Sequence, residues 1–185
     1  MRASVRLCLI PFVLLPVAAA SAAPPAIETH QCVRKGGGIS EERYVSIGGI
    51  EQWMTIRGAN CANPVVLIVH GGPGNPMTPY AQKLYGAWEK DFTLVQWDQR
   101  GAGRTFGRNK GSADETLTVE GMAKDGVEVA QYAASRLGKQ KVILKGGSWG
   151  SVLAVHMAKM RPDMFVAYVG TSQLVSSGGN GLASY

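Results

Sequence analysis

The sequence predicts an α/β fold, in which a mostly parallel sheet carries helices on both faces. Short apolar segments alternate with longer segments of helical periodicity, which is the order expected of repeated strand and helix units. One short segment, residues 65–69, is apolar at every position, as is typical of a strand buried on both faces. A Gly-x-Ser-x-Gly motif occupies residues 146–150, between a predicted strand and a predicted helix.

The first 22 residues are predicted to form a secretory signal peptide. Arg2 and Arg6 precede an apolar run that ends at Ala20, and small residues follow it. The run holds about 14 residues, fewer than the roughly 20 that a bilayer span requires. We therefore expect cleavage of residues 1–22, export to the periplasm or the medium, and no stable membrane span in the mature protein.

Residues 23–42 are expected to form an exposed leader, because they are polar and include prolines and three consecutive glycines. Of the three cysteines, Cys8 lies in the signal peptide, and Cys32 and Cys61 remain. In an oxidising compartment these two could pair and stabilise the fold by about 3 to 4 kcal/mol. The alternative of two free, half-buried thiols stays open, since the sequence alone does not decide the pairing.

The composition argues against several classes of partner. Loss of Arg2 and Arg6 with the signal peptide lowers the formal net charge from +6 to +4. The remaining basic residues are scattered among acidic ones, and we expect no binding of nucleic acid. The sequence has neither a phosphate-binding Gly-x-x-x-x-Gly-Lys segment nor His or Cys residues at metal-ligand spacing, and so no cofactor and no metal are expected.

Two antiparallel strands are predicted to open the domain, at residues 43–47 and 50–57. The pair Gly48-Gly49 between them has the composition of a two-residue hairpin turn. After the buried strand at 65–69, the pattern indicates a helix at 80–89 and a strand at 92–97.

A long amphipathic helix is the clearest helical element. Its apolar residues recur at helical spacing over residues 119–137, so that one face can pack on the sheet. Thr118 can cap its first turn and Gly138 can end it. A strand at 141–144, another helix and a sixth strand at 164–169 complete the alternation.

The strongest chemical signal is the motif Gly146-Gly147-Ser148-Trp149-Gly150. Its glycines suit a turn so sharp that flanking side chains would collide, and the strained Ser148 is the expected nucleophile. The amide of Trp149, at the start of the following helix, can stabilise an oxyanion. A glycine-rich turn that only joins a strand to a helix is the alternative, but the apolar strand and helix on either side favour the catalytic interpretation.

A second motif, His70-Gly71-Gly72-Pro73-Gly74, directly follows the buried strand. Its glycines let the backbone approach a substrate closely, so the amide of Gly72 is expected to be the second donor of the oxyanion hole. His70 precedes the turn, and we expect it to support the loop by hydrogen bonds instead of acting as the base.

The third motif, Asp98-Gln99-Arg100-Gly101-Ala102-Gly103, follows the strand at 92–97. In this order and spacing, the three motifs resemble those of proline iminopeptidase and its near relatives among the serine peptidases of α/β-hydrolase fold, over about residues 43–169. Thr105 is a mild departure, since that family commonly has serine there. We expect Asp98 and Arg100 to form a structural ion pair that braces the loops.

The resemblance implies a serine nucleophile, a later acidic residue, a still later histidine, and a helical lid whose acidic residues hold the free amino terminus of the substrate. The histidines of this chain are His30, His70 and His156. His156 lies about 12 Å from Ser148 by helical rise, and Asp163 precedes the sixth strand, so neither completes a triad. We therefore expect residues 43–185 to be a partial α/β-hydrolase domain, truncated after about the sixth strand and without the lid and the carboxy-terminal part.

The substrate that the resemblance implies is a small peptide, from which amino-terminal proline or a similar residue is released through an acyl-enzyme at Ser148. An esterase or lipase is the alternative among enzymes, because this chemistry serves many acyl substrates. A dehalogenase or epoxide hydrolase is disfavoured, since those relatives have aspartate at the nucleophile position. Outside the enzymes, the chain could be an inactive remnant or a binding module, because a serine without a base stays protonated.

Overall fold

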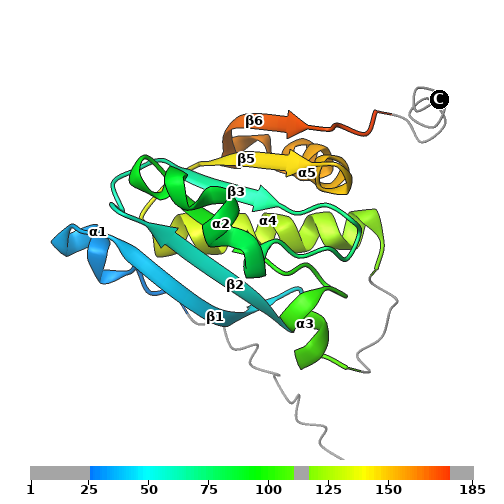
Figure 1. Ribbon diagram of the computed structural model, residues 1–185, viewed down its shortest axis with the longest axis horizontal. Coiled ribbons are helices and arrows are strands. Elements are labelled where there is room, and N and C mark those ends of the chain that lie inside the picture. Colours follow the sequence, from blue (N-terminus) through cyan, green and yellow to red (C-terminus); the bar gives the residue numbers. More distant parts are fainter. Residues whose placement is uncertain (1–25, 111–116, 176–185) are drawn as a thin grey trace, which may run out of the picture.

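The computed structural model describes residues 26–110 and 117–175, which form a six-stranded sheet in the order β1-β2-β4-β3-β5-β6 (Figure 1). Strand β2 pairs antiparallel with both β1 and β4, and the pairs β3·β4, β3·β5 and β5·β6 are parallel. The predicted class, a mostly parallel sheet with helices, is confirmed. The strands are β1 (Ile39–Ile47), β2 (Ile50–Gly58), β3 (Val65–Val69), β4 (Thr93–Trp97), β5 (Val142–Gly147) and β6 (Phe165–Thr171).

Helices cover the two faces of the sheet unequally. The two long helices share one face, and α2 lies on the other (Figure 1). The helices are α1 (Gln31–Lys35), α2 (Ala81–Tyr85), α3 (Gly103–Arg108), α4 (Val119–Arg136) and α5 (Trp149–Met160), with 3-10 turns η1 (Thr78–Tyr80), η2 (Gly86–Lys90) and η4 (Pro162–Met164).

The central strand β3 separates a large core from a small one. All five of its residues are buried, as predicted, because alternate side chains enter opposite faces. Leu67 packs in the large core with α4 and α5, where Ala130 and Leu153 are fully buried. Val66 and Ile68 join Leu94 in the smaller core beneath α2 and η2.

The predicted hairpin turn and long helix are both confirmed. Gly48 and Gly49 have φ of 55° and 79°, the left-handed pair that a type I′ turn requires, and Ile47 pairs with Ile50 across it. At the start of α4, the Thr118 side chain accepts a hydrogen bond from the Gly121 amide at 3.0 Å.

A Schellman motif ends α4. Gly138 has φ 61°, its amide donates to Ser135, and the Lys139 amide donates to Ala134. The structure thus satisfies the last carbonyls of the helix at the glycine that the sequence pattern indicated.

Where the structure describes the leader at 23–42, most of its residues are exposed, but the segment also packs on the domain. Cys32 and Ile39 are buried, and the first strand begins at Ile39, four residues before the predicted start at Arg43. The backbone of His30 donates to Arg136 at the end of α4, and so the short helix α1 packs on the domain. Tertiary anchoring of this kind leaves no trace in local composition.

Two further elements differ from the sequence prediction. The single helix expected at 80–89 is divided into η1, α2 and η2, because the backbone leaves helical dihedrals at Tyr80 and Tyr85 and the connection between β3 and β4 follows tight 3-10 turns. Helix α3 was not predicted, since its sequence, rich in glycine and arginine, lacks an apolar face of helical period.

The predicted signal peptide at 1–22 lies outside the described residues. In the ranges that the structure does describe, no helix is long and apolar enough to cross a membrane.

Candidate active site

Ser148 sits at a sharp turn between β5 and α5. Its φ of 51° and ψ of −125° make it one of two non-glycine residues with positive φ in the described chain, and the residue is exposed. Its amide donates to the Thr171 carbonyl at 3.1 Å, which ties the turn to the end of β6. This is the strained, exposed conformation that a nucleophile elbow needs.

Close backbone contacts leave no room for a side chain at Gly146 or at Gly150. A Cβ at Gly146 would lie 2.5 Å from the Gly150 carbonyl oxygen, and a Cβ at Gly150 would overlap the carbonyl oxygens of Val69 and His70. Helix α5 therefore starts directly against the end of β3, a separation that only glycine permits.

The His70–Gly74 loop lies beside Ser148. A Cβ at Gly71 would be 3.2 Å from the Gly147 carbonyl oxygen and 3.9 Å from Ser148 Oγ. Gly72 has φ 118°, which favours glycine, and precedes a cis peptide bond to Pro73. Within the described residues, the amides of Gly72 and Trp149 donate to no backbone acceptor outside the regular helices and strands, as the predicted oxyanion role requires.

His70 is engaged at both ring nitrogens. Its Nε2 accepts from the Gln99 amide at 3.1 Å, so Nδ1 carries the proton and donates to the Gly71 carbonyl at 2.9 Å. The Gln99 side chain also donates to the His70 carbonyl at 2.9 Å. Burial lowers the pKa of His70, against weaker opposing effects of the Gly71 carbonyl and Asp98, and the neutral ring holds the loop in place.

Asp98 and Arg100 do not form the ion pair that the sequence suggested. The buried Asp98 carboxylate accepts from the Thr78 hydroxyl at 2.6 Å and from the Arg104 amide at 2.8 Å. The Thr105 hydroxyl donates to the Asp98 carbonyl and accepts from the Trp53 amide. Threonine at 105 therefore supplies both bonds that a serine hydroxyl would make there.

Arg100 pairs instead with Asp125 on α4, through Nε to Oδ2 at 3.0 Å and Nη2 to Oδ1 at 3.1 Å. Gln52 donates to the same carboxylate at 2.6 Å, and Arg100 also donates to the Gly48 carbonyl at 2.7 Å. Both charged side chains are nearly buried. The ion pair expected between Asp98 and Arg100 does not form, because α4 places Asp125 against this loop. Backbone and hydroxyl donors already bind the Asp98 carboxylate.

Ser151 is a site residue that the sequence reasoning missed. Its buried hydroxyl donates to the Ser148 carbonyl at 2.6 Å and accepts from the Leu174 amide at 3.0 Å. The signal available was its position, one turn into the helix after the nucleophile, where a hydroxyl can bond back to the carbonyl three residues earlier. Ser151 thus fixes the elbow to the chain that leaves β6.

None of the three histidines of the chain contacts Ser148. His30 accepts from the Cys32 amide, His70 is engaged as described, and His156 is exposed on α5. In the described part of the chain, the Ser148 hydroxyl makes no hydrogen bond to a base. The described residues therefore include the predicted nucleophile and the two predicted oxyanion donors, and no histidine among them lies in a position to take the serine proton.

Comparison with known proteins places this geometry among hydrolases. Residues 60–180 match the family described as serine aminopeptidase, S33. The chain is 39% identical over 134 residues to the probable aminopeptidase YbaC of Bacillus subtilis, covering 72% of this chain and 42% of that protein. It is 31% identical over 121 residues to the proline iminopeptidase of Neisseria meningitidis, covering 65% and 36%. The chain thus spans less than half the length of these relatives.

Two solved hydrolase-related structures illustrate the similarity in fold. The proline iminopeptidase-related protein from Thermus thermophilus superposes with a TM-score of 0.55 at 25% identity, over 70% of this chain and 44% of that one. An epoxide hydrolase from Vigna radiata gives a TM-score of 0.58 at 25% identity, over 71% and 39%. The predicted α/β-hydrolase fold is therefore confirmed.

Proposed function

Because this chain belongs to the serine aminopeptidase family S33, we propose that it is the nucleophile-bearing part of a serine hydrolase that releases amino-terminal proline or a similar residue from peptides. One observation carries the proposal: Ser148 is exposed in a left-handed turn, at the start of a helix and against the Gly71-Gly72 loop. The probable aminopeptidase and the proline iminopeptidases similar to the chain support the peptide substrate.

The proposed reaction begins with attack of Ser148 Oγ on the carbonyl carbon of the first residue. A base takes the hydroxyl proton, and the carbonyl oxygen becomes an oxyanion that the amides of Gly72 and Trp149 stabilise. Collapse of this intermediate expels the remaining peptide as an amine, which receives the proton, and leaves the first residue esterified to Ser148. Water then releases it by the same steps.

The base and its acidic partner are proposed to come from sequence outside these 185 residues. Without them the chain alone is expected to turn over about a millionfold more slowly than a complete serine peptidase. The coding sequence beyond Tyr185 tests this directly. An in-frame continuation that encodes an acidic residue and then a histidine is expected; a stop codon there would favour an inactive remnant or a binding module.

Substrate preference is measured on the longer protein with prolyl p-nitroanilide, N-acetylprolyl p-nitroanilide and p-nitrophenyl acetate. The free prolyl anilide is expected to give the highest kcat/KM, and the acetylated one to react poorly because its amino group is blocked. Clear preference for the acetate ester would assign an esterase instead, and equal rates on the two anilides would exclude an aminopeptidase.

Export is a separate proposal, motivated by the basic and apolar start of the sequence. The mature protein is expected in the periplasm or the medium with Ala23 as its first residue. Mass spectrometry of its amino-terminal peptide checks this, and recovery of the peptide that begins at Met1 from the cytoplasm would contradict it.

A further inference from the structure

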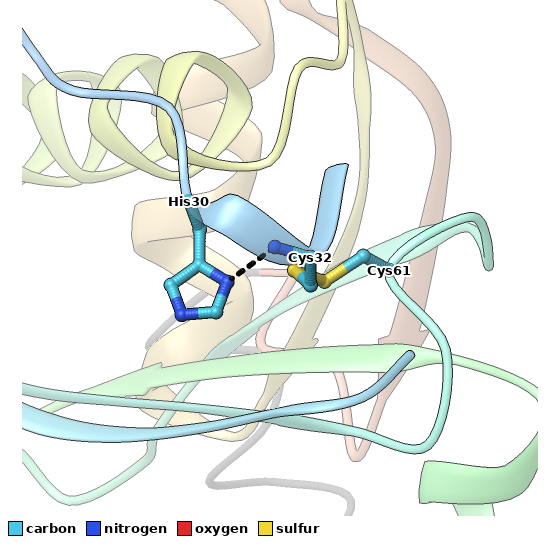
Figure 2. Close-up of side chains that lie close together, drawn as sticks. All are labelled: His30, Cys32 and Cys61. Atoms are coloured by element: carbon cyan, nitrogen blue, oxygen red, sulfur yellow. Dashed lines mark hydrogen bonds between the residues drawn. A yellow bond between two sulfur atoms is a disulfide. The ribbon is translucent and has the colours of Figure 1, made fainter. Parts of the chain in front are cut away.

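Three metal-binding side chains meet at the junction of α1 and the loop before β3. His30, Cys32 and Cys61 each place one ligand atom within 4.8 Å of the others. Figure 2 shows the imidazole beside the Cys32–Cys61 disulfide, with Nδ1 turned toward Cys32. Both cysteines are buried, and the His30 side chain is mostly so. His30 and Cys32 are close in sequence, but Cys61 follows Cys32 by 29 residues, and so a search for short metal-binding spacings does not find the full cluster.

Contacts other than the disulfide hold these residues in place. The His30 amide donates to the Arg136 carbonyl at 2.8 Å, which fixes the start of α1 on the end of α4. The Cys61 amide donates to the Gly37 carbonyl at 3.0 Å, just after α1. The two backbones, 6.0 Å apart at Cα, are therefore tied together independently of the sulfur bond, and the thiols are expected to stay close once reduced.

A carboxylate lies behind the imidazole. Glu41 Oε1 is 3.7 Å from His30 Nε2, and Arg136 binds the same carboxylate. Histidine ligands of metals commonly bind with one nitrogen and direct the other N–H to a carboxylate, which orients the ring and strengthens its donor atom. With Nε2 facing Glu41, Nδ1 is the nitrogen on the side of the sulfurs.

We propose that the reduced form of this cluster binds one Zn²⁺ ion through Cys32 Sγ, Cys61 Sγ and His30 Nδ1. An external dithiol reduces the disulfide: it supplies two electrons and two protons, and is itself oxidised to a disulfide. Zn²⁺ then displaces one proton from each thiol, while neutral His30 donates a lone pair. In exchange for the metal bond, Nδ1 gives up the hydrogen bond from the Cys32 amide at 3.1 Å.

The chemistry of the three donors selects the ion. Two thiolates and an imidazole suit Zn²⁺, whereas Mg²⁺ and Ca²⁺ require oxygen ligands. The two thiolates neutralise the charge of the ion, and the nearby Glu41–Arg136 pair adds no net charge. Three protein ligands leave one tetrahedral position, which a water molecule can fill. The disulfide and the metal exclude each other, so occupancy follows the redox state.

The test uses the full chain in a Cys8→Ser background, so that only two thiols remain. The protein is reduced with a dithiol, freed of reductant, and titrated with Zn²⁺ while alkylation of each cysteine is followed by mass spectrometry. One Zn²⁺ per chain is expected to protect both cysteines. The oxidised chain should bind none, and Mg²⁺ should protect neither cysteine.

Two variants separate a metal site from simple burial of the thiols. His30→Gln is expected to weaken zinc binding by at least tenfold, and Glu41→Gln by about tenfold to a hundredfold through the ring that it orients. His156→Gln, an exposed histidine on α5, should leave the affinity unchanged. Thermal melts of the oxidised variants show whether each still folds. Equal zinc protection in His30→Gln, or none in the parent, would overturn the proposal.

Discussion

Ser148, the proposed nucleophile, has a strained backbone that surrounding residues hold in place. A non-glycine residue at positive φ costs on the order of 1–3 kcal/mol. The Ser148 amide donates a hydrogen bond to the Thr171 carbonyl, and the buried Ser151 hydroxyl donates one to the Ser148 carbonyl. The elbow is thus over-determined by bonds to α5 and to the end of β6, so its geometry is present before any substrate arrives.

Gly150 is predicted to be intolerant of a methyl group. Gly150→Ala places Cβ against the carbonyl oxygens of Val69 and His70, and the strain is expected to destabilise the fold by about 1–3 kcal/mol or more. Gly107→Ala is the matched control, because a Cβ there meets nothing within 4 Å on helix α3. It should stabilise by up to about 1 kcal/mol. Urea unfolding measures the stability of both variants. Equal stabilities would contradict the predicted steric clash at Gly150.

Stability should fall as the pH drops below the unfolded pKa of histidine, near 6.5. Burial lowers the pKa of His70 in the fold, so the unfolded state binds the proton first. The stabilisation is therefore complete above about pH 6.5 and is lost at up to about 1.4 kcal/mol per pH unit as the pH falls toward the folded pKa. His70→Gln, which keeps an acceptor for Gln99, should flatten this part of the profile. A parallel profile in the variant would assign the dependence to other groups.

Residue roles were predictable where the backbone dictates them. The glycines around Ser148 and the loop at Gly71 follow from a turn that only small residues can make, and the motif alone indicated this. The partner of Arg100 was not predictable, because Asp125 reaches it only when α4 packs on the hairpin. Ion pairs between distant elements depend on packing that local sequence does not encode.

At the scale of elements, the Arg100–Asp125 pair joins the loop after β4, the hairpin and α4. Arg100→Met leaves the Asp125 carboxylate buried without its cation, and the expected loss of stability is about 3–5 kcal/mol. Changing Arg100 and Asp125 together to apolar residues should recover much of this loss. Asp163→Asn breaks the exposed pair with Arg161 and should have no measurable effect. Denaturant unfolding measures the stability of each variant. A loss of less than about 1 kcal/mol in Arg100→Met would show that the pair does not stabilise the contact between these elements.

Periodic elements were predicted well, and short irregular ones were not. The apolar residues of the helix at 119–136 recur over many turns, and the strand at 65–69 is apolar on both faces. Residues 80–89 were predicted to form one helix, because short 3-10 turns use the same residue types as a helix. Helix α1 is anchored by the hydrogen bond from the His30 amide to Arg136, and the Cys32–Cys61 disulfide also joins it to the loop before β3; neither contact is a local signal.

At the scale of the whole molecule, β6 is one of the two edge strands of the sheet that the structure describes, and β1 is the other. Strand β6 contains neither proline nor charge, and Val166 and Val169 are 66% and 47% exposed. Its unpaired backbone groups form a template for another strand. The chain of 185 residues is therefore expected to self-associate.

Size-exclusion chromatography with light scattering tests whether the chain self-associates through β6. Val166→Lys should shift the protein toward monomer, because a charge on an edge strand opposes pairing. Val175→Lys, beyond the strand and 84% exposed, is the control and should change little. A monodisperse, cooperatively melting monomer of the unchanged chain would refute the prediction.

The proposed hydrolase function depends on Ser148 as the nucleophile. A fluorophosphonate probe on the longer protein measures this most directly, because it reacts only with an activated serine. We expect the probe to label one residue, Ser148. Labelling should be abolished in Ser148→Ala and retained in Ser135→Ala, which changes an exposed serine on α4. Labelling that persists in Ser148→Ala, or that maps to another serine, would contradict it.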